Sequence, residues 1–500
     1  MSLFSRKKSL DVLMAQAGDS EKGLKRTLGA GSLIALGIGA IIGAGLFVKT
    51  AQAAGEHAGP AVTLSFIVAA IGCAFAGLCY AEFASMIPIA GSAYTYAYAT
   101  MGELVAWVIG WALILEYALG AATVSIAWSE FLNKLLEQYH LGAIPYEWSH
   151  SPFEKALDIN NVMHVGIMNV PALFILLLLS LLLIKGTQES ALVNSVIVLV
   201  KVAIVILFII VGWKYINPSN HTPFMIPENA PPALKPDGTF YDYVADFRNH
   251  GLFGVLTGAG VVFFAFIGFD AVSTAAQEAK NPKRDMPIGI LGSLVICTLL
   301  YVLFSWVLTG VAPYTDFIKS GKEASVAYVI ETYMKDQIWL AKTVTIAILA
   351  GFSSVILVML MGQSRVFYTM ASDGLLPKMF SDLHPKFKTP YKSNIILFFF
   401  VGAFAAFIPS KVAGDLTSIG TLFAFALVCI GVWVMRKNDP DRERPFKTPF
   451  VPLVPILGVV VCTIMIVLLP RDTQLSALGW MAIGLVVYFG YSKANSKLKE

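Results

Sequence analysis

The stretch GIGAIIGAGLFV, residues 37–48, contains four glycines within nine positions, at Gly37, Gly39, Gly43 and Gly45. It lies in an apolar run, residues 30–53, that is long enough to cross a bilayer as a helix. Each glycine weakens a helix by about 1 kcal/mol relative to alanine. The stretch therefore predicts either an interrupted membrane helix or a close-packed seam of small residues.

A second irregular stretch is GVVFFAFIGFDAVST, residues 260–274, which places Gly268 beside the acidic residue Asp270 within another apolar run. The two runs are five spans apart, so they enter the bilayer from opposite sides. Matching interruptions in oppositely oriented segments are typical of inverted-repeat transporters, which bind substrate at the breaks. The pair predicts a binding site where two helices unwind.

The remaining sequence indicates a membrane protein. Of 500 residues, 57% are hydrophobic and 14% are charged, whereas soluble domains carry roughly a quarter charged residues. Runs of about 20 apolar residues predict twelve transmembrane helices, at residues 30–53, 60–86, 104–131, 170–186, 190–213, 252–276, 287–311, 338–369, 393–409, 415–435, 450–469 and 475–492. We expect an all-α polytopic membrane protein, which excludes a soluble multidomain enzyme and a disordered chain.

The Lys and Arg residues of the connecting segments predict the orientation. With the N-terminus inside, cytoplasmic segments carry more than twice as many of them as external segments. We therefore expect a multi-pass protein of the cell membrane, bacterial in origin, with both termini cytoplasmic. The net charge of +4 gives no reason to expect a nucleic acid partner.

The two interruptions would expose complementary backbone groups. The half-helix after the first break presents free N–H groups, those of about Gly43, Ala44 and Gly45. The breaks also leave carbonyl groups without helical partners, those of Ile41, Phe264, Ala265 and Ile267. Because a helix N-terminus attracts a carboxylate and free carbonyls attract an ammonium group, the pattern predicts a site for a zwitterionic α-amino acid.

Among the ionisable residues inside predicted spans, Lys201, Glu116 and Asp270 are the candidates for function. At 1.5 Å per residue, Lys201 is roughly 13 Å from the nearer end of its span, too far to reach water. An ammonium at this depth predicts function, either replacing a bound cation or releasing a proton. Glu116 is expected to move protons or to make a structural hydrogen bond, and Asp270 to cap, gate or contact substrate.

Neither a cofactor nor a metal site is expected. The five cysteines lie within apolar runs, and the seven histidines lie outside them without ligand spacing. No HExxH, paired-carboxylate or Ser/His constellation lies within the spans, so we do not expect an enzyme. The competing class is a channel, which would be expected to line its pore with rings of charged residues or with repeated filter carbonyls.

Five stretches of the chain resemble the amino acid–polyamine–organocation (APC) superfamily, and within it the bacterial relatives of the cationic amino acid transporters. They are GIGAIIGAGLFV (37–48), CYAEFASMIPIAGSAYTYAYATMGELVAWVIGWALILEY (79–117), FFAFIGFDAVSTAAQEAKNPKRDMPIGI (263–290), GQSRVFYTMASDGLLP (362–377) and RPFKTPFVPLVP (444–455). The resemblance implies a LeuT-like, five-plus-five inverted repeat with helices 1 and 6 unwound at the midplane.

This resemblance implies the following division of the chain. It comprises a cytoplasmic N-terminal segment (1–29), a first repeat of helices 1–5 (30–213), an extracellular loop (214–251), a second repeat of helices 6–10 (252–435), a cytoplasmic loop (436–449), peripheral helices 11 and 12 (450–492) and a cytoplasmic tail (493–500).

The resemblance also implies roles for single residues. Ile41, Ala44 and Gly45 would meet the substrate backbone from the first helix, and Phe264, Ala265 and Ile267 from the sixth. Lys201 matches a lysine that, in proton-coupled members, stands where sodium-coupled relatives bind an ion. Glu116 matches an acidic residue found in the bacterial relatives of the cationic amino acid transporters. Met359 replaces the small residue of animal cationic transporters, which favours neutral substrates.

The expected activity is therefore proton-coupled uptake of small or apolar neutral L-amino acids by alternating access. Its partners are the amino acid, protons and the lipid bilayer, and an accessory membrane subunit is left open. Two alternatives remain: an exchanger of amino acids or amines without net proton flow, and a permease for cationic amino acids.

Overall fold

The computed structural model describes residues 7–8, 28–87, 89, 91–157, 162–185, 190–235, 238–276, 279–319, 326–387 and 389–498. Most of the predicted N-terminal segment, residues 1–29, lies outside this described part. The last two residues of the predicted tail, 493–500, also lie outside it.

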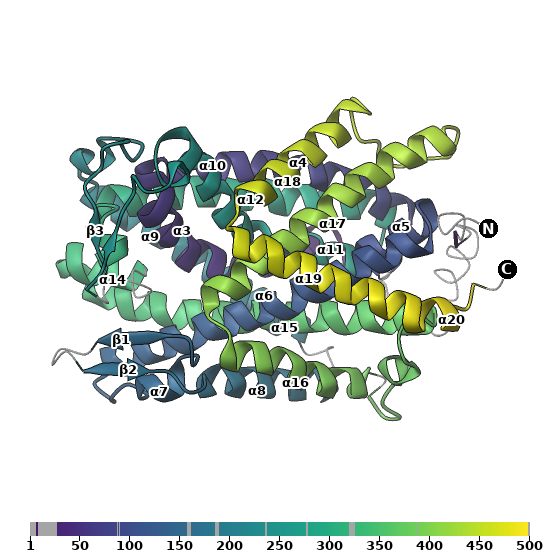
Figure 1. Ribbon diagram of the computed structural model, residues 1–500, viewed down its shortest axis with the longest axis horizontal. Coiled ribbons are helices and arrows are strands. Elements are labelled where there is room, and N and C mark those ends of the chain that lie inside the picture. Colours follow the sequence, from purple (N-terminus) through teal and green to yellow (C-terminus); the bar gives the residue numbers. More distant parts are fainter. Residues whose placement is uncertain are drawn as a thin grey trace.

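Helices form most of the molecule, as an elongated bundle (Figure 1). Their bounds are α2 Ala30–Ile41, α3 Thr50–Ala53, α4 Val62–Met86, α5 Ser92–Thr100, α6 Glu103–Gln138, α7 Tyr146–Ser149, α8 Val170–Lys185, α9 Ser190–Gly212, α10 Gly251–Val262, α11 Ala271–Thr274, α12 Pro282–Val311, α13 Asp316–Lys319, α14 Val326–Tyr333, α15 Ile338–Ser372, α16 Tyr391–Phe407, α17 Ser410–Asn438, α18 Leu453–Leu468, α19 Arg471–Val487 and α20 Lys493–Asn495.

By length and composition, eight helical segments of the described chain can cross a membrane: Gly45–Met86, Glu103–Gln138, Ser195–Tyr215, Gly251–Thr274, Pro282–Val311, Lys335–Ser372, Ser410–Asn438 and Arg471–Asn495. Four shorter apolar helices accompany them: Ala30–Ile41, Val170–Lys185, Tyr391–Phe407 and Leu453–Leu468. The chain is thus an all-α polytopic membrane protein.

The segment between the first two predicted spans, residues 54–59, is helical rather than an irregular loop. The π-helices η1 (Gly45–Lys49) and η2 (Ala54–Ala58) flank α3, and the 3-10 turn η3 (Gly59–Ala61) leads into α4. Gly59 turns the chain there with φ +63°, a backbone conformation that glycine adopts readily. Helical structure therefore continues through this link.

Two small β-hairpins were not predicted. Strand β1 (Lys155–Leu157) pairs antiparallel with β2 (Met163–Val165), and β3 (Ala233–Leu234) pairs antiparallel with β4 (Phe240–Tyr241). Strands of two or three residues are too short to show an alternating pattern in the sequence. Both hairpins lie at the same end of the bundle, at the left of Figure 1.

The two ends of the described chain meet at the opposite end of the bundle, at the right of Figure 1. Lys8 Nζ lies 2.8 Å from Asp373 Oδ1, and Lys497 Nζ donates to the Ser372 carbonyl at 2.6 Å. Both contacts are made to the end of α15. Lys8 and Lys497 therefore lie on one side of the molecule.

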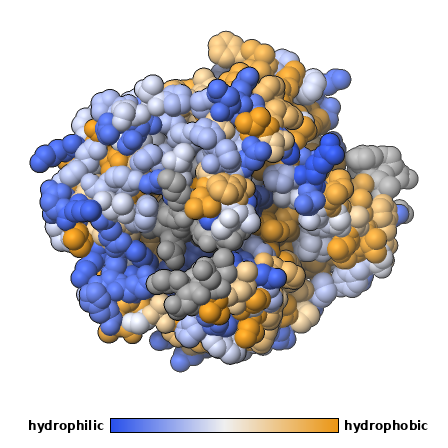
Figure 2. All heavy atoms as spheres, turned by 60° about the vertical axis from the view of Figure 1, so that its left-hand side comes forward, coloured by the Kyte–Doolittle hydropathy of each residue, from blue (hydrophilic) through white to orange (hydrophobic). Residues whose placement is uncertain are grey.

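The outer faces of several helices are apolar. Leu199 on α9, Phe399 on α16 and Val486 on α19 are each about 70% exposed (70%, 69% and 72%). Figure 2 shows hydrophilic residues gathered over the end that carries the hairpins and hydrophobic residues toward the right of the view. Exposed apolar side chains on helix faces are expected where lipid is the solvent.

Candidate functional site

The first predicted interruption is present. Helix α2 ends at Ile41, and Ile42 is extended, with φ −73° and ψ 104°. Helical conformation returns at Ala44, and the Leu46 N–H donates to the Gly43 carbonyl at 3.2 Å. The break, at Ile42 and Gly43, therefore lies within the glycine-rich stretch, where helix propensity is low.

The second interruption is also present. Helix α10 tightens into the 3-10 turn η7 (Phe263–Phe266), and Ile267 then turns away with ψ 136°. Gly268 follows with φ +109°, which favours glycine because a side chain there would be strained. Four residues in helical conformation, α11, come after Asp270.

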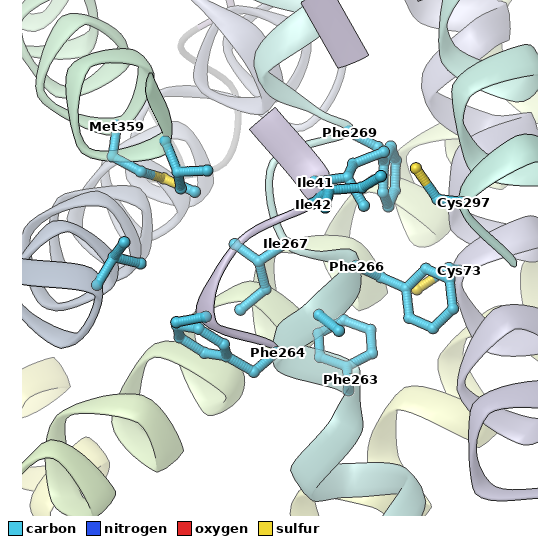
Figure 3. Close-up of a cluster of buried hydrophobic side chains, with 14 of the residues drawn as sticks. Ile41, Ile42, Cys73, Phe263, Phe264, Phe266, Ile267, Phe269, Cys297 and Met359 are labelled. Atoms are coloured by element: carbon cyan, nitrogen blue, oxygen red, sulfur yellow. The ribbon is translucent and has the colours of Figure 1, made fainter. Parts of the chain in front are cut away.

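The two breaks touch through their backbones (Figure 3). A Cβ added at Gly45 would lie 2.2 Å from the Cα of Ala265. A Cβ added at Gly268 would lie 2.9 Å from the carbonyl oxygen of Ala40. Each helix thus uses a glycine to approach the other, so the glycines that weaken the helices also bring the breaks together.

Apolar side chains surround the breaks. Ile41, Ile267 and Phe264 lie beside the unwound backbone, and Met359 lies across from them on α15 (Figure 3). None of these four side chains is more than 6% exposed. Of the predicted substrate-binding residues, the structure therefore gathers both breaks and Met359 into one buried region.

Tyr301 on α12 is a site residue that sequence reasoning missed. Its buried hydroxyl lies 3.0 Å from the Ile41 carbonyl oxygen and 2.8 Å from that of Ala265, so it bridges both breaks. A tyrosine within an apolar run looks like packing, and no signal in the sequence distinguishes it. The hydroxyl has one proton and donates it to one carbonyl at a time.

The carbonyls predicted to be free are therefore partly occupied. Tyr301 approaches those of Ile41 and Ala265, and the Ile267 N–H donates to the Phe264 carbonyl at 3.3 Å. Each carbonyl oxygen has two lone pairs, so each retains capacity for a second hydrogen bond.

Lys201 on α9 is brought to the first break. Its side chain is 1% exposed, and its ammonium donates to the carbonyls of Gly39 at 2.5 Å and Ile42 at 3.0 Å. Carbonyls at the end of a helix lack intrahelical partners and carry the negative end of its dipole. The ammonium thus satisfies the backbone that the break of α2 exposes.

Glu116 and Asp270 lie apart from the Lys201 ammonium. Both are fully buried and close enough to interact electrostatically. The Tyr117 hydroxyl donates to Asp270 Oδ2 at 2.7 Å, and the carboxylate makes no capping hydrogen bond to α11. Within the described residues, Glu116 makes no hydrogen bond of standard geometry, although Thr421 lies beside it. The role of Asp270 in capping, gating or substrate contact stays a prediction.

The described residues contain no group of three or more His, Cys, Asp or Glu side chains that could hold a metal ion. The five cysteines are buried thiols without disulfide partners.

The chain is similar to known transport proteins along nearly its whole length. Residues 28–491 match the family model described as amino acid permease. The branched-chain amino acid permease BcaP of Bacillus subtilis is 42% identical over 504 residues, which cover 100% of this chain and 99% of the relative. The methylthioribose transporter of the same organism is 40% identical over 500 residues, 100% of both chains.

A plant relative is more distant. The vacuolar cationic amino acid transporter 4 of Arabidopsis thaliana is 34% identical over 442 residues, 88% of this chain and 68% of the relative. The family model, these relatives and the apolar helices agree on a membrane transporter rather than an enzyme. The chain belongs to the amino acid permease family of the APC superfamily.

Proposed function

We propose that this protein takes up small or apolar neutral L-amino acids together with protons, by alternating access. The observation that carries the proposal is the contact between two broken helices inside an apolar shell, with a lysine ammonium fixed at the end of the first. The 42% identity to a relative named as a branched-chain amino acid permease supports a neutral substrate.

The substrate backbone would bind between the breaks. Its carboxylate faces the N–H groups that open the helix after the first break, at Gly43, Ala44 and Gly45. Its ammonium faces the carbonyls of Phe264 and Ile267, together with the lone pairs that Tyr301 leaves at Ile41 and Ala265. A zwitterion would thereby satisfy backbone groups that the unwinding exposes.

The substrate side chain would lie among Ile41, Phe264, Ile267 and Met359. These residues offer dispersion contacts and no charge, so a branched aliphatic side chain gains from burial there. A cationic side chain would lose its hydration without a carboxylate among these four residues. This contrast favours neutral over cationic substrates.

Proton coupling would run through Lys201. While protonated, its ammonium holds the Gly39 and Ile42 carbonyls and so fixes the end of α2. Loss of the proton would weaken these charge-assisted hydrogen bonds and release α2, which links protonation to the position of a helix. Glu116, buried beside Asp270, would serve as a second proton-carrying group, and Asp270 and Gly268 would support the helix break.

The architecture we propose is a five-plus-five inverted repeat of twelve transmembrane helices, with residues 30–213 and 252–435 as its halves. The first and sixth helices would unwind at the midplane, and α18 and α19 would lie outside the repeats. The protein would lie in a bacterial cell membrane with cytoplasmic termini, which is supported by the meeting of both chain ends at one end of the bundle.

Uptake into proteoliposomes tests the proposal. Labelled isoleucine should accumulate when the outside is more acidic than the lumen, and unlabelled valine or leucine should compete while arginine should not. Counterflow that ignores the proton gradient would instead indicate an exchanger. Transport of methylthioribose without transport of any amino acid would replace the proposal with the activity named for the 40% identical relative.

A further inference from the structure

A cavity opens on the side of the first break that faces the hairpin end of the bundle. We call it the outer cavity, and its volume is about 210 Å³. It is lined by residues of η1 and α3, η2, the end of α6, the β3–β4 hairpin, α13 and the start of α17. Drug-sized ligands occupy cavities of about 300–1,000 Å³, so this one suits a smaller molecule. Lys49, which lines it, lies four residues after Gly45, or about 6 Å along the helix.

The ammonium of Lys49 is buried but incompletely paired. The residue is 3% exposed, and the structure records one hydrogen bond for its ammonium, to Gln52 Oε1 at 3.0 Å. The Asp415 carboxylate lies 3.9 Å away, beyond hydrogen-bond distance. A buried cation is stable only when paired and hydrogen-bonded, so this position favours an incoming anion.

The neighbouring lysine of the cavity contrasts with Lys49. The Lys411 ammonium lies 2.9 Å from Glu56 Oε2 and is therefore engaged by a carboxylate. Gly414 packs tightly against Lys49: a Cβ there would lie 2.9 Å from its Cε and 3.0 Å from its ammonium, so the missing side chain lets the lysine lie close to α17. The third cavity lysine, Lys235, is only partly buried and lies over the Tyr241 ring. Lys49 is thus the buried lysine of the cavity, and no carboxylate of the described residues lies within hydrogen-bond distance of its ammonium.

The remaining lining matches the other parts of a neutral amino acid. Val48, Phe317 and Ile318 form an apolar wall, and Glu130 and Glu56 supply carboxylates across the same cavity. A substrate carboxylate on Lys49 would leave its ammonium near an acid and its side chain near the apolar wall. The lining therefore offers cationic, anionic and apolar side chains.

We propose that the outer cavity is a second, external binding site for the transported amino acid, in which Lys49 holds the α-carboxylate before the substrate reaches the breaks. This inference rests on the proposed function, because it assumes an amino acid substrate. It adds a site one helical turn or more outside the central one.

Binding of labelled isoleucine to the purified full-length protein in nanodiscs tests the inference. The unsubstituted protein should bind two molecules per chain, one of them weakly. Lys49→Met should abolish the weak site or weaken it at least tenfold, while Lys49→Arg, which keeps the charge, should retain it. Lys134→Met is the matched control, since this lysine pairs with Glu331 and does not line the outer cavity.

A second measurement needs no substitution. Isoleucine amide lacks the carboxylate, so it should fail to displace isoleucine from the weak site of the unsubstituted protein. Equal displacement by the amide, or a single site that Lys49→Met leaves unchanged, overturns the outer cavity as a binding site and leaves the proposed function standing. The absence of any isoleucine binding to the unsubstituted protein overturns both.

Discussion

Single buried polar residues decide how the two helix breaks are stabilised. Lys201 holds the carbonyls at the end of α2, and Tyr301 reaches a carbonyl in each break. Unsatisfied backbone groups at membrane depth cost several kcal/mol each. The unwound segments are therefore stable because these side chains replace helical hydrogen bonds.

Substituting Lys201 by alanine should remove the response to protons. Without the ammonium, nothing that titrates holds the Gly39 and Ile42 carbonyls, so uptake should become insensitive to an imposed proton gradient. Isoleucine uptake into proteoliposomes at several external pH values measures this. Lys342→Ala, which removes a lysine whose ammonium lies 4.9 Å from the Tyr139 ring, is the control. An unchanged pH profile in Lys201→Ala would refute the role of Lys201.

Removing the Tyr301 hydroxyl should affect both stability and binding. Tyr301→Phe leaves a buried carbonyl without a donor, which should lower the free energy of unfolding by about 1–3 kcal/mol. It should also raise the KM for isoleucine, since the hydroxyl aligns carbonyls from both helices. Thermal unfolding and uptake kinetics measure the two effects. Tyr314→Phe, which removes a hydroxyl outside the breaks, should change neither, and equal effects in both variants would contradict the bridge.

At the scale of elements, the contact between the two broken helices determines the candidate site. Gly45 packs on the backbone of Ala265, and Gly268 packs on that of Ala40. In both contacts the nearest atom belongs to the backbone, so it cannot rotate away as a side chain could. The relative position of α2–α3 and α10–α11 therefore depends on two residues without a Cβ.

Gly45→Ala should abolish uptake, because its Cβ would lie 2.2 Å from Ala265 Cα and would push the two breaks apart. Gly479→Ala on α19 is the matched control: nothing lies within 4 Å of its added Cβ. The control should be neutral or stabilising by up to about 1 kcal/mol, as alanine is the better helix former. Uptake and thermal unfolding compare the two, and an active Gly45→Ala variant would show that the breaks need not touch.

Helix α19 is attached more firmly than a peripheral position suggests. The Trp111 indole donates to the Trp480 carbonyl at 2.8 Å, and the Trp480 indole donates to the Trp111 carbonyl at 3.1 Å. The Trp107 indole donates to the Gly484 carbonyl at 2.8 Å. These bonds join α19 to α6, the helix that carries Glu116 and Tyr117, so α19 supports the element behind the buried acids.

At the scale of the whole molecule, both chain ends meet at one end of the bundle and the two hairpins lie at the other. Two cysteine variants should therefore be labelled from opposite sides of the membrane. Ala494→Cys should react only with reagent on the cytoplasmic side, and Ala143→Cys only with external, impermeant maleimide. Both positions are exposed, and the five native cysteines are buried, so background labelling should be low. Labelling of both variants from one side would contradict the proposed orientation.

The membrane environment and the positions of the two helix breaks could be predicted from the amino-acid sequence. Runs of about 20 apolar residues indicate membrane-spanning helices, and such runs can be recognised from composition alone. The clustered glycines and Gly268 indicate where helix propensity is low. Both interruptions lie where the glycines predicted them. The buried lysine was also identifiable, because depth within a run follows from counting residues.

Which groups meet at those breaks could not be predicted, because it depends on how the helices pack in three dimensions. Tyr301 contacts the carbonyls of Ile41 and Ala265, although it is 260 residues from Ile41 and 36 residues from Ala265 along the sequence. The incomplete pairing of Lys49 depends on α17, far along the chain. The short hairpins likewise form through pairing that no local pattern records. Such contacts depend on helix positions in space, and sequence periodicity specifies the buried face of a helix but not the atoms that face it.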